Sequence, residues 1–414
     1  MSVPFHPDES TQIYMSKDVE LIINHTSELF YQELPQNPME QNYRLLDAPL
    51  TKYFIGIFRK VFNQQQLSSD WDWTKPWSEN QSAFPSRTLL LTSRLSTAIF
   101  FPFSVIFFGL IMKDVFKNNI SLLIVSVSMF AFNSLLLLHT RRAMAESVMI
   151  FFLLVCIYAL AKIPKKWIFL VAFPMAFAMN AKQSLIFLIP IAVLIIIYYF
   201  RKQWKILGMQ VFFFLVLLAS IFFVLNPIMW EDPIKVSLQM LDRRSELSKK
   251  QVTAIESVTP EYITDSLPQK LTALVAQTFI LQPTPQEISN YQNEINQSVL
   301  EYFNNPLHRG LIRNLTVGAL YFLLFLFGFY KSFSFLNGKY KLILGGGFLF
   351  FCIEILFLLA IPFQRYYLPA IPYIIIFSMI GLAKIAEIFK NSSLYPPFRT
   401  GISKILIGLC NSLR

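Results

Sequence analysis

Charged residues and cysteines are both scarce in this chain of 414 residues, and each shortage excludes a class of protein. Only 15% of the residues are charged, whereas 54% are hydrophobic and 42 are Phe. A soluble domain does not need so much apolar surface, because a single hydrophobic core stops growing near ~250–300 residues. The few cysteines lie in apolar runs or near the C-terminus, so we expect no disulfide framework from Cys156, Cys352 and Cys410.

Signals for secretion and for nucleic-acid binding are also missing. The first ten residues, MSVPFHPDES, have no basic start and no apolar stretch, so we expect no signal peptide there. The net charge of +11 would suit nucleic acid, but Lys and Arg come in short clusters between apolar runs, as the positive-inside rule predicts. We therefore expect no nucleic-acid partner. No dense group of His and Asp forces a metal site either.

Apolar runs of about twenty residues are what the sequence has instead, and that is the length a helix needs to cross a ~30 Å hydrocarbon layer. We predict an all-α polytopic membrane protein whose main partner is the lipid bilayer. The runs predict nine spanning helices, at residues 88–112, 120–138, 146–162, 167–180, 184–200, 207–226, 311–330, 342–361 and 367–384.

The basic residues of the short loops predict the orientation, because the side with more of them is cytoplasmic. One side holds Arg141, Arg142, Lys182 and Arg365, and the other holds Lys113, Lys117, Lys162, Lys165, Lys166, Arg201, Lys202, Lys205, Lys331, Lys339 and Lys341. We expect a multi-pass protein of the bacterial plasma (inner) membrane. Its predicted parts are an extracytoplasmic segment 1–87, spans in 88–226 and 311–384, an extracytoplasmic helical subdomain 227–310 and a cytoplasmic tail 385–414.

Two segments have the pattern of helices that lie on a membrane. In 49–62 the apolar residues recur with helical spacing, and Lys52, Arg59 and Lys60 fall on the opposite face. The tail from Ile402 to Leu413 repeats this pattern more weakly, and packing on neighbouring helices is the alternative. The tryptophans of WDWTKPW, which precede the first span, are typical of headgroup anchors; a sugar-stacking platform is the other interpretation.

The candidate acid/base groups are Asp8 and Glu9, which the topology places outside the membrane. A carboxylate can take the proton of an attacking hydroxyl. Alternatively, Asp8 only begins a helix that runs toward Tyr31, where a carboxylate is favourable.

Candidate phosphate ligands are the four cations of the short external loops, Arg141, Arg142, Lys182 and Arg365, which lie on the side where topology disfavours them. Guanidinium groups bind phosphate oxygens bidentately, and an ammonium acts as a point charge. The alternative is that each cation pairs with a nearby acid or reaches the headgroups. Glu146 and Glu354 are the acidic counterparts, and we expect Glu354 to form a structural ion pair.

Seven segments, in order along nearly the whole chain, resemble motifs of the GT-C glycosyltransferases. They are most similar to the protein mannosyltransferase-like branch that includes the lipid A aminoarabinose transferase. The segments are HPDES, LDAPLTKYFIGIFRKVF, SRLSTAIF, RRAMAESVMIFFLLVCIYAL, MNAKQSLIFLIP, NPIMWEDPI and PFQRYYLPAIPYIIIF.

This resemblance implies a GT-C helical bundle with an external cavity. Asp8 would be the catalytic base with Glu9 beside it. The donor groove would be lined by Arg141, Lys182, Arg365 and Tyr366, and we add Arg142, Asp47 and Glu146 as substrate-binding candidates. The implied donor is a polyprenyl-phosphate sugar. Some enzymes of this family use a divalent cation and others do not, so the resemblance makes no cofactor certain and leaves a divalent cation open.

The chain departs from the family in two ways. The His-Pro-Pro-Leu of the family stands here as Asp47-Ala48-Pro49-Leu50, which puts the role of that His in doubt. The family also has a spanning helix before its acidic motif, whereas this chain begins seven residues before Asp8. We expect either a further helix upstream or an inactive member of the family.

The predicted function is an inverting transfer of a sugar from a lipid phosphate to a hydroxyl of a protein, lipid or glycan acceptor. A transporter or flippase of lipid-linked sugars is one rival. Transporters place polar groups near the bilayer midplane and show internal repeats, whereas here the charges gather at the outer edge. A non-catalytic scaffold is the other rival.

Overall fold

The computed structural model describes residues 3–117, 119–286, 291 and 293–391, and this part of the chain is helical and contains no strand. Six of its helices are long and apolar enough to cross a membrane, as the sequence predicts. The chain is therefore an all-α polytopic membrane protein. The six helical segments are Arg87–Phe116, Gln183–Phe200, Trp204–Val224, Leu315–Phe335, Gly338–Leu358 and Ala370–Lys390.

The other three predicted spans are shorter or interrupted. The predicted span 120–138 ends early, at α7 (Ile120–Ala131), because the Asn133 side chain accepts the backbone N–H groups of Leu135 and Leu136 and begins a new helix, α8 (Ser134–His139). The third, α9 (Glu146–Lys162), has the predicted limits and 17 residues. The fourth begins as a 3-10 helix, Lys165–Val171, which is kinked at Trp167 and continues as α10 (Ala172–Ala181).

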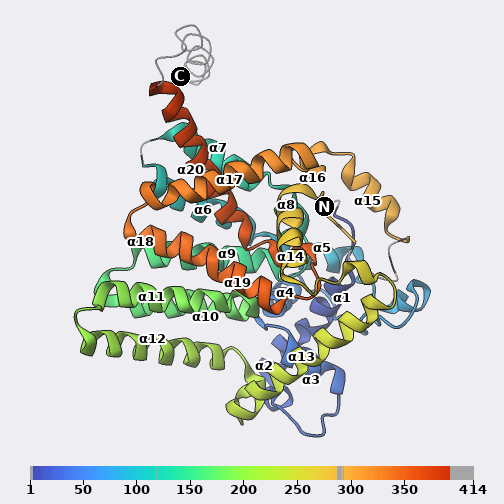
Figure 1. Ribbon diagram of the computed structural model, residues 1–414. Helices are drawn as coiled ribbons and strands as arrows, with labels where there is room; N and C mark the ends of the chain where they lie inside the picture. Colours follow the sequence, from blue (N-terminus) through green and yellow to red (C-terminus); the bar gives the residue numbers. More distant parts are fainter. Residues whose placement is uncertain (1–2, 118, 287–290, 292, 392–414) are drawn as a thin grey trace.

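The spanning helices run side by side, and the polar segments gather at one end of them (Figure 1). We call the described parts of 3–86 and 226–314 the head. Its helices are α1 (Pro7–Tyr14), α2 (Asp18–Asn24), α3 (Pro38–Leu46), α4 (Leu50–Val61), α13 (Pro233–Glu256), α14 (Leu267–Val275), α15 (Asn296–Phe303) and α16 (Pro306–Arg309). The bundle consists of α7 to α10 with α5 (Arg87–Ala98), α6 (Phe100–Phe116), α11 (Leu188–Phe200), α12 (Trp204–Val224), α17 (Leu315–Phe335), α18 (Gly338–Tyr340), α19 (Gly347–Leu358) and α20 (Ala370–Asn391).

The bundle core lies around α9 and α20. Leu153, Leu154 and Ile157 of α9 are fully buried, as is the middle of α20. The outermost helix, α12, instead exposes Phe212 and Leu215 along its side, which is the surface that lipid covers in a membrane.

Two glycines bring α17 and α20 into backbone contact. A Cβ atom on Gly328 would lie 1.8 Å from the carbonyl oxygen of Phe377, and one on Gly381 would lie 2.7 Å from that of Leu324. Only a residue without a side chain fits at such a distance, and small residues serve this purpose between membrane helices. The two helices are therefore fixed against each other.

Helix α4 covers the predicted membrane-surface segment, but two of the three cations of its predicted polar face are not solvated. Lys52 forms an ion pair with Asp18 (3.0 Å), Arg59 forms one with Glu20, and both cations are buried. The prediction of a solvated face is therefore wrong for Lys52 and Arg59, because α2 supplies carboxylates that remove these two cations from water, whereas Lys60 is exposed as predicted. The opposite side of α4 remains apolar and partly exposed, as at Val61.

Two further predictions need correction. Trp71 is not a headgroup anchor, because it is buried among Trp77, Phe84 and Tyr291 in a core of the head. Glu354 of α19 is half-buried, but within the described part of the chain no ion pair involves it and its Oε2 has no hydrogen-bond partner. The predicted tail helix, 402–413, lies outside the described residues.

The orientation can be tested by cysteine labelling in intact cells. Positions 265, in the head, and 203, between α11 and α12, are both exposed, so each is accessible to a reagent on its own side. A membrane-impermeant maleimide should label a cysteine at 265 and leave one at 203 unmodified until the membrane is permeabilised. The reverse result would place the head in the cytoplasm.

Candidate functional site

The HPDES motif forms the start of α1 as a capping box. The His6 side chain accepts the backbone N–H of Asp8, and Glu9 returns the bond by accepting the N–H of His6 at 3.1 Å. Such reciprocal bonds satisfy N–H groups that the first turn of a helix leaves unpaired. The motif therefore fixes where α1 begins and in which direction its two carboxylates point.

Glu9 points into the protein and is fully buried. It accepts bonds of 2.8 Å from both Nε and Nη2 of Arg94 in α5, and a third of 2.8 Å from the backbone N–H of Ala143. With the N–H of His6, these donors occupy the roughly four acceptor positions that a carboxylate has. The expected catalytic role of Glu9 is therefore replaced by a structural one, since no position remains for an acceptor hydroxyl.

Asp8 points the other way, and its side chain is 30% exposed. It forms an ion pair with Arg365, which lies 357 residues further along the chain. Burial acts to raise the pKa of Asp8, but the charges of Arg365, His6 and Arg142 outweigh it and lower the pKa to about 2. In this structure Asp8 is thus an ionised carboxylate held by a guanidinium group.

Arg365 belongs to a short helical turn, Gln364–Tyr367, between α19 and α20. Gln364 fixes this turn to the head, because its Oε1 accepts the N–H of Thr284 at 2.7 Å and its Nε2 donates to the carbonyl of Gln282 at 3.1 Å. The next residue, Tyr366, presents its ring to two cations. The ring centre lies 5.6 Å from the Arg365 guanidinium and 5.4 Å from Lys182 Nζ.

Lys182 follows α10 and has its own carboxylate. Its Nζ lies 2.9 Å from Oε1 of Glu146, the first residue of α9, and the charge of Arg365 also acts on Glu146. Two ion pairs, Asp8–Arg365 and Glu146–Lys182, are thus joined by the ring of Tyr366, which both cations contact. The structure brings together these five residues, which the sequence had singled out from four separate segments.

Asp47 ends α3 and is the second carboxylate near Asp8. It forms no hydrogen bond or ion pair through its side chain with any described residue. Burial and the Asp8 charge raise its pKa, against the opposing effects of Lys52, Arg244 and Arg365. Asp8 and Asp47 are therefore neighbouring carboxyl groups whose pKa values are shifted in opposite directions.

Arg141 and Arg142 lie outside this cluster. The buried Arg142 donates to the backbone carbonyls of Pro4 (3.3 Å) and Pro285 (2.6 Å), although its charge still acts on Asp8. Arg141 contacts the ring of His308 at 3.4 Å, beside the α15–α16 connection. No interaction within the described part of the chain joins Arg141 to Lys182 or Arg365, so the structure does not bring Arg141 together with the other residues expected to line the donor groove.

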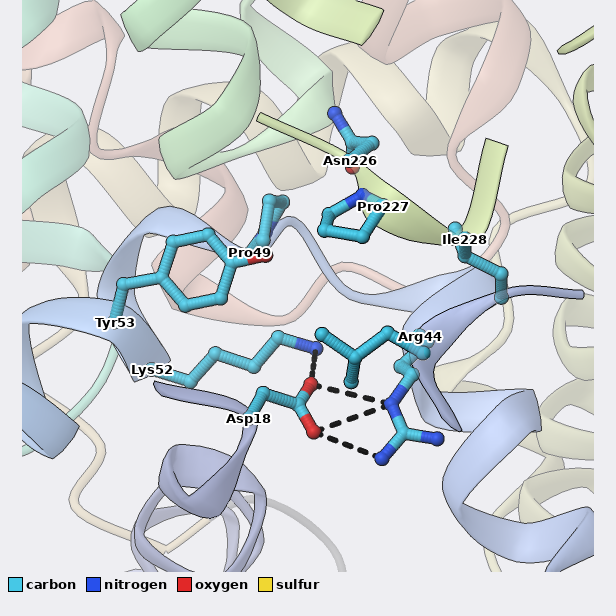
Figure 2. A pocket seen from close by; sticks show the side chains of 9 residues that line it. Asp18, Arg44, Pro49, Lys52, Tyr53, Asn226, Pro227 and Ile228 are labelled. Atoms are coloured by element: carbon cyan, nitrogen blue, oxygen red, sulfur yellow. Dashed lines mark hydrogen bonds and ion pairs between the residues drawn. The ribbon is translucent and has the colours of Figure 1, made fainter. Parts of the chain in front are cut away.

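A small pocket of the head is lined on one side by a buried ion triad (Figure 2). Asp18 lies 2.8 Å from Nη2 of Arg44 and 3.0 Å from Nζ of Lys52, and Tyr53 and Asn226 line the opening. The empty space, mouth included, is ≈ 220 Å³, below the ~300–1,000 Å³ typical of ligand sites. The triad joins α2, α3 and α4, and we assign it to the structure of the head.

Sequence reasoning missed several of these partners. Arg94 lies within an apolar run that predicts a span, and a lone arginine in such a run signals a buried partner. Nothing comparable marks Arg244 of α13, whose charge acts on Asp47. Within the described residues, no three His, Cys, Asp or Glu side chains are grouped as metal ligands would be.

Comparison with known proteins adds no family to this description. Searched against protein-family models and against curated proteins, the chain matches none significantly. The chemistry of the site is therefore the remaining indication of function.

The buried carboxylates can be distinguished by their effect on stability. Asp18→Asn leaves Lys52 buried without its partner, and breaking a buried pair costs roughly 3–5 kcal/mol. Its thermal unfolding midpoint, measured in detergent at pH 7, should therefore fall well below that of the wild type. Asp47→Asn should behave in the opposite way, because it removes a carboxylate that is buried at a cost when ionised.

The pH dependence of Asp47→Asn checks this assignment. The folded-state pKa of Asp47 is raised above its ordinary value of 3.8, which means that stability is lost as pH rises through the folded pKa. The gain in the unfolding midpoint should therefore be present at pH 7 and disappear as pH falls toward 3.8. A variant destabilised at pH 7 would show that ionised Asp47 has a stabilising partner.

Proposed function

We propose that this chain is a membrane glycosyltransferase of the GT-C type, which moves a sugar from a polyprenyl-phosphate donor to a hydroxyl on the extracytoplasmic face. The observation that carries the proposal is the cluster around Tyr366, where Arg365 and Lys182 contact one ring and Arg365 also pairs with the partly exposed carboxylate of Asp8. Two cations suit a phosphate, and the carboxylate suits a hydroxyl that must lose its proton. Spanning helices next to the site suit a lipid-linked donor.

In the proposed reaction the acceptor oxygen attacks the anomeric carbon of the donor sugar from the side opposite the phosphate. The bond from this carbon to the phosphate oxygen breaks, and its electron pair leaves with the polyprenyl phosphate. The hydroxyl proton passes to Asp8. The phosphate gains one negative charge as Asp8 loses one, so the total charge of the site stays constant through the step.

Arg365 connects these two charge changes. In the donor-free structure it is paired with Asp8 and keeps the pKa of that group near 2, which makes Asp8 a weak base. A bound phosphate competes for the same guanidinium group. Once Arg365 turns to the phosphate, the pKa of Asp8 rises because its main counter-charge has left, and the carboxylate becomes able to take a proton. Lys182 holds the phosphate as a second cation.

A transporter or flippase of lipid-linked sugars is the alternative, and Glu354 is the observation that favours it. Transporters place polar groups inside their spanning helices, and Glu354 is a half-buried carboxyl group within α19. The remaining candidate site charges lie at the head end of the bundle, however, where a water-soluble acceptor has access. This arrangement favours transfer over transport.

Substitution of Asp8 and Arg365 should separate turnover from donor binding. Asp8→Asn removes the base and also the competitor for Arg365. Turnover should fall by about 10²- to 10⁴-fold, while a radiolabelled polyprenyl-phosphate hexose should bind at least as tightly as to the wild type. Arg365→Ala should weaken binding of the same donor by roughly 1.5–3 kcal/mol, the usual value of a charge-assisted contact.

Asp72→Asn is the matched control, because Asp72 is a head carboxylate whose nearest cation is Lys75 of its own loop. It should change neither quantity. If Asp8→Asn lost donor binding as fully as Arg365→Ala, the ion pair would be needed to build the site, and the exchange of Arg365 would be refuted. Wild-type turnover in Asp8→Asn would remove Asp8 as the base.

A further inference from the structure

Glu146 is a buried carboxylate that accepts a hydrogen bond from described residues at only one of its two oxygens. Its exposed fraction is 2%. Oε1 accepts a bond of 2.9 Å from Lys182, whereas Oε2 is buried and has no hydrogen-bond partner among the described residues. An unpaired buried acceptor is costly, more so when it is charged, and native proteins keep few of them.

Two fully buried carboxylates of the head, Glu9 and Asp18, do not share this feature. Glu9 accepts bonds at both oxygens from Arg94 and from backbone N–H groups. Asp18 is held at both oxygens by Arg44 and Lys52. Glu20, which joins α2 to α4 through Arg59, also has an Oε2 without a partner, but its side chain is 29% exposed. Glu146 differs because its vacant oxygen belongs to a side chain that is only 3% exposed and lies beside Lys182.

The position of Glu146 indicates which group could donate a hydrogen bond to its Oε2. Oε1 is bonded to Lys182, and Arg365 is close enough for its charge to lower the free energy of the Glu146 carboxylate. These are the two cations assigned to the donor phosphate. In such a donor the sugar ring is bonded directly to the phosphate, so its hydroxyl groups lie within a few bonds of the same two cations.

We propose that Glu146 is a specificity-determining residue whose Oε2 accepts a hydrogen bond from one ring hydroxyl of the donor sugar. This inference rests on the proposed glycosyl transfer and adds the group that reads the sugar. A donor that lacks this hydroxyl leaves the carboxylate oxygen unpaired in the complex as well. Sites that are built to bond a substrate hydroxyl discriminate strongly against analogues without it.

The test uses the full chain with a polyprenyl-phosphate hexose and a set of its deoxy analogues, each lacking one ring hydroxyl. On the wild type, one analogue should lose about 10- to 100-fold in kcat/KM, as expected for a bond to a charged group. This measurement needs no variant and does not depend on whether a variant folds.

The second part repeats the series on Glu146→Gln. The amide oxygen of Gln faces Lys182, because an NH2 group there would repel the ammonium, so an NH2 group replaces Oε2. The bond to the hydroxyl then joins neutral groups, and the discrimination should shrink to a few-fold. Glu354→Gln is the matched control, since Glu354 also has an unpaired buried Oε2 but no cation beside it. It should keep the wild-type pattern.

Two results would overturn the inference. One is an equal response of the wild type to every deoxy analogue. The other is an equal loss by Glu146→Gln on all analogues and on binding of sugar-free polyprenyl phosphate, which would mean that Glu146 acts only through Lys182. Failure of the proposed function has a different signature, because the wild type would then neither bind nor consume any polyprenyl-phosphate sugar.

Discussion

The buried pair of Glu9 and Arg94 holds the start of α1 against α5, and the geometry of the whole site follows from it. Successive residues of a helix point about 100° apart. With Glu9 fixed toward α5, Asp8 has to face away from the bundle core, toward the turn that carries Arg365. The capping box sets the first turn, the ion pair sets its rotation, and together they determine which carboxylate meets the site.

Charge balance is the second constraint on the head. Each structural carboxylate buried there is matched by a cation from another segment: Asp18 by Arg44 and Lys52, and Glu40 by Lys17 and Arg44. Moving an unpaired charge out of water costs several kcal/mol, so unmatched charges are rare. Against this background, Asp47, without a partner, and Glu146, with one vacant oxygen, are exceptions. Both lie close enough to Asp8 or Arg365 to be affected by their charge, in the site that we propose for the donor.

The sequence predicted the fold class well because the spanning helices are determined locally. An apolar run of sufficient length has to cross the membrane as a helix, whatever its neighbours are. The break at Asn133 escaped prediction, since it depends on a side chain turning back to cap the backbone. The buried cationic face of α4 escaped for another reason: an amphipathic pattern shows that a face is charged, but not whether water or carboxylates such as Asp18 cover it.

The sequence predicted which residues belong to the candidate site better than it predicted which of them form ion pairs with each other. Topology placed Asp8, Lys182 and Arg365 at one level of the bundle, and the structure brings them together. Topology could not exclude Arg141, because the sequence does not show that its side chain points to His308 and not to the site. Topology also could not distinguish Asp8 from Glu9. Their different environments depend on Arg94, which lies 85 residues after Glu9 and binds it.

The glycine contact between α17 and α20 restricts how the site can move. Arg365 is joined to α20 through a short connection, and α20 is locked against α17 at Gly328 and Gly381. A rocking or sliding of α20 would separate two backbones that touch. In the proposed reaction the guanidinium group would therefore change partners by turning about its own side-chain bonds, a motion of picoseconds to nanoseconds for an accessible side chain. The proposed exchange then requires no sliding of α20 against α17.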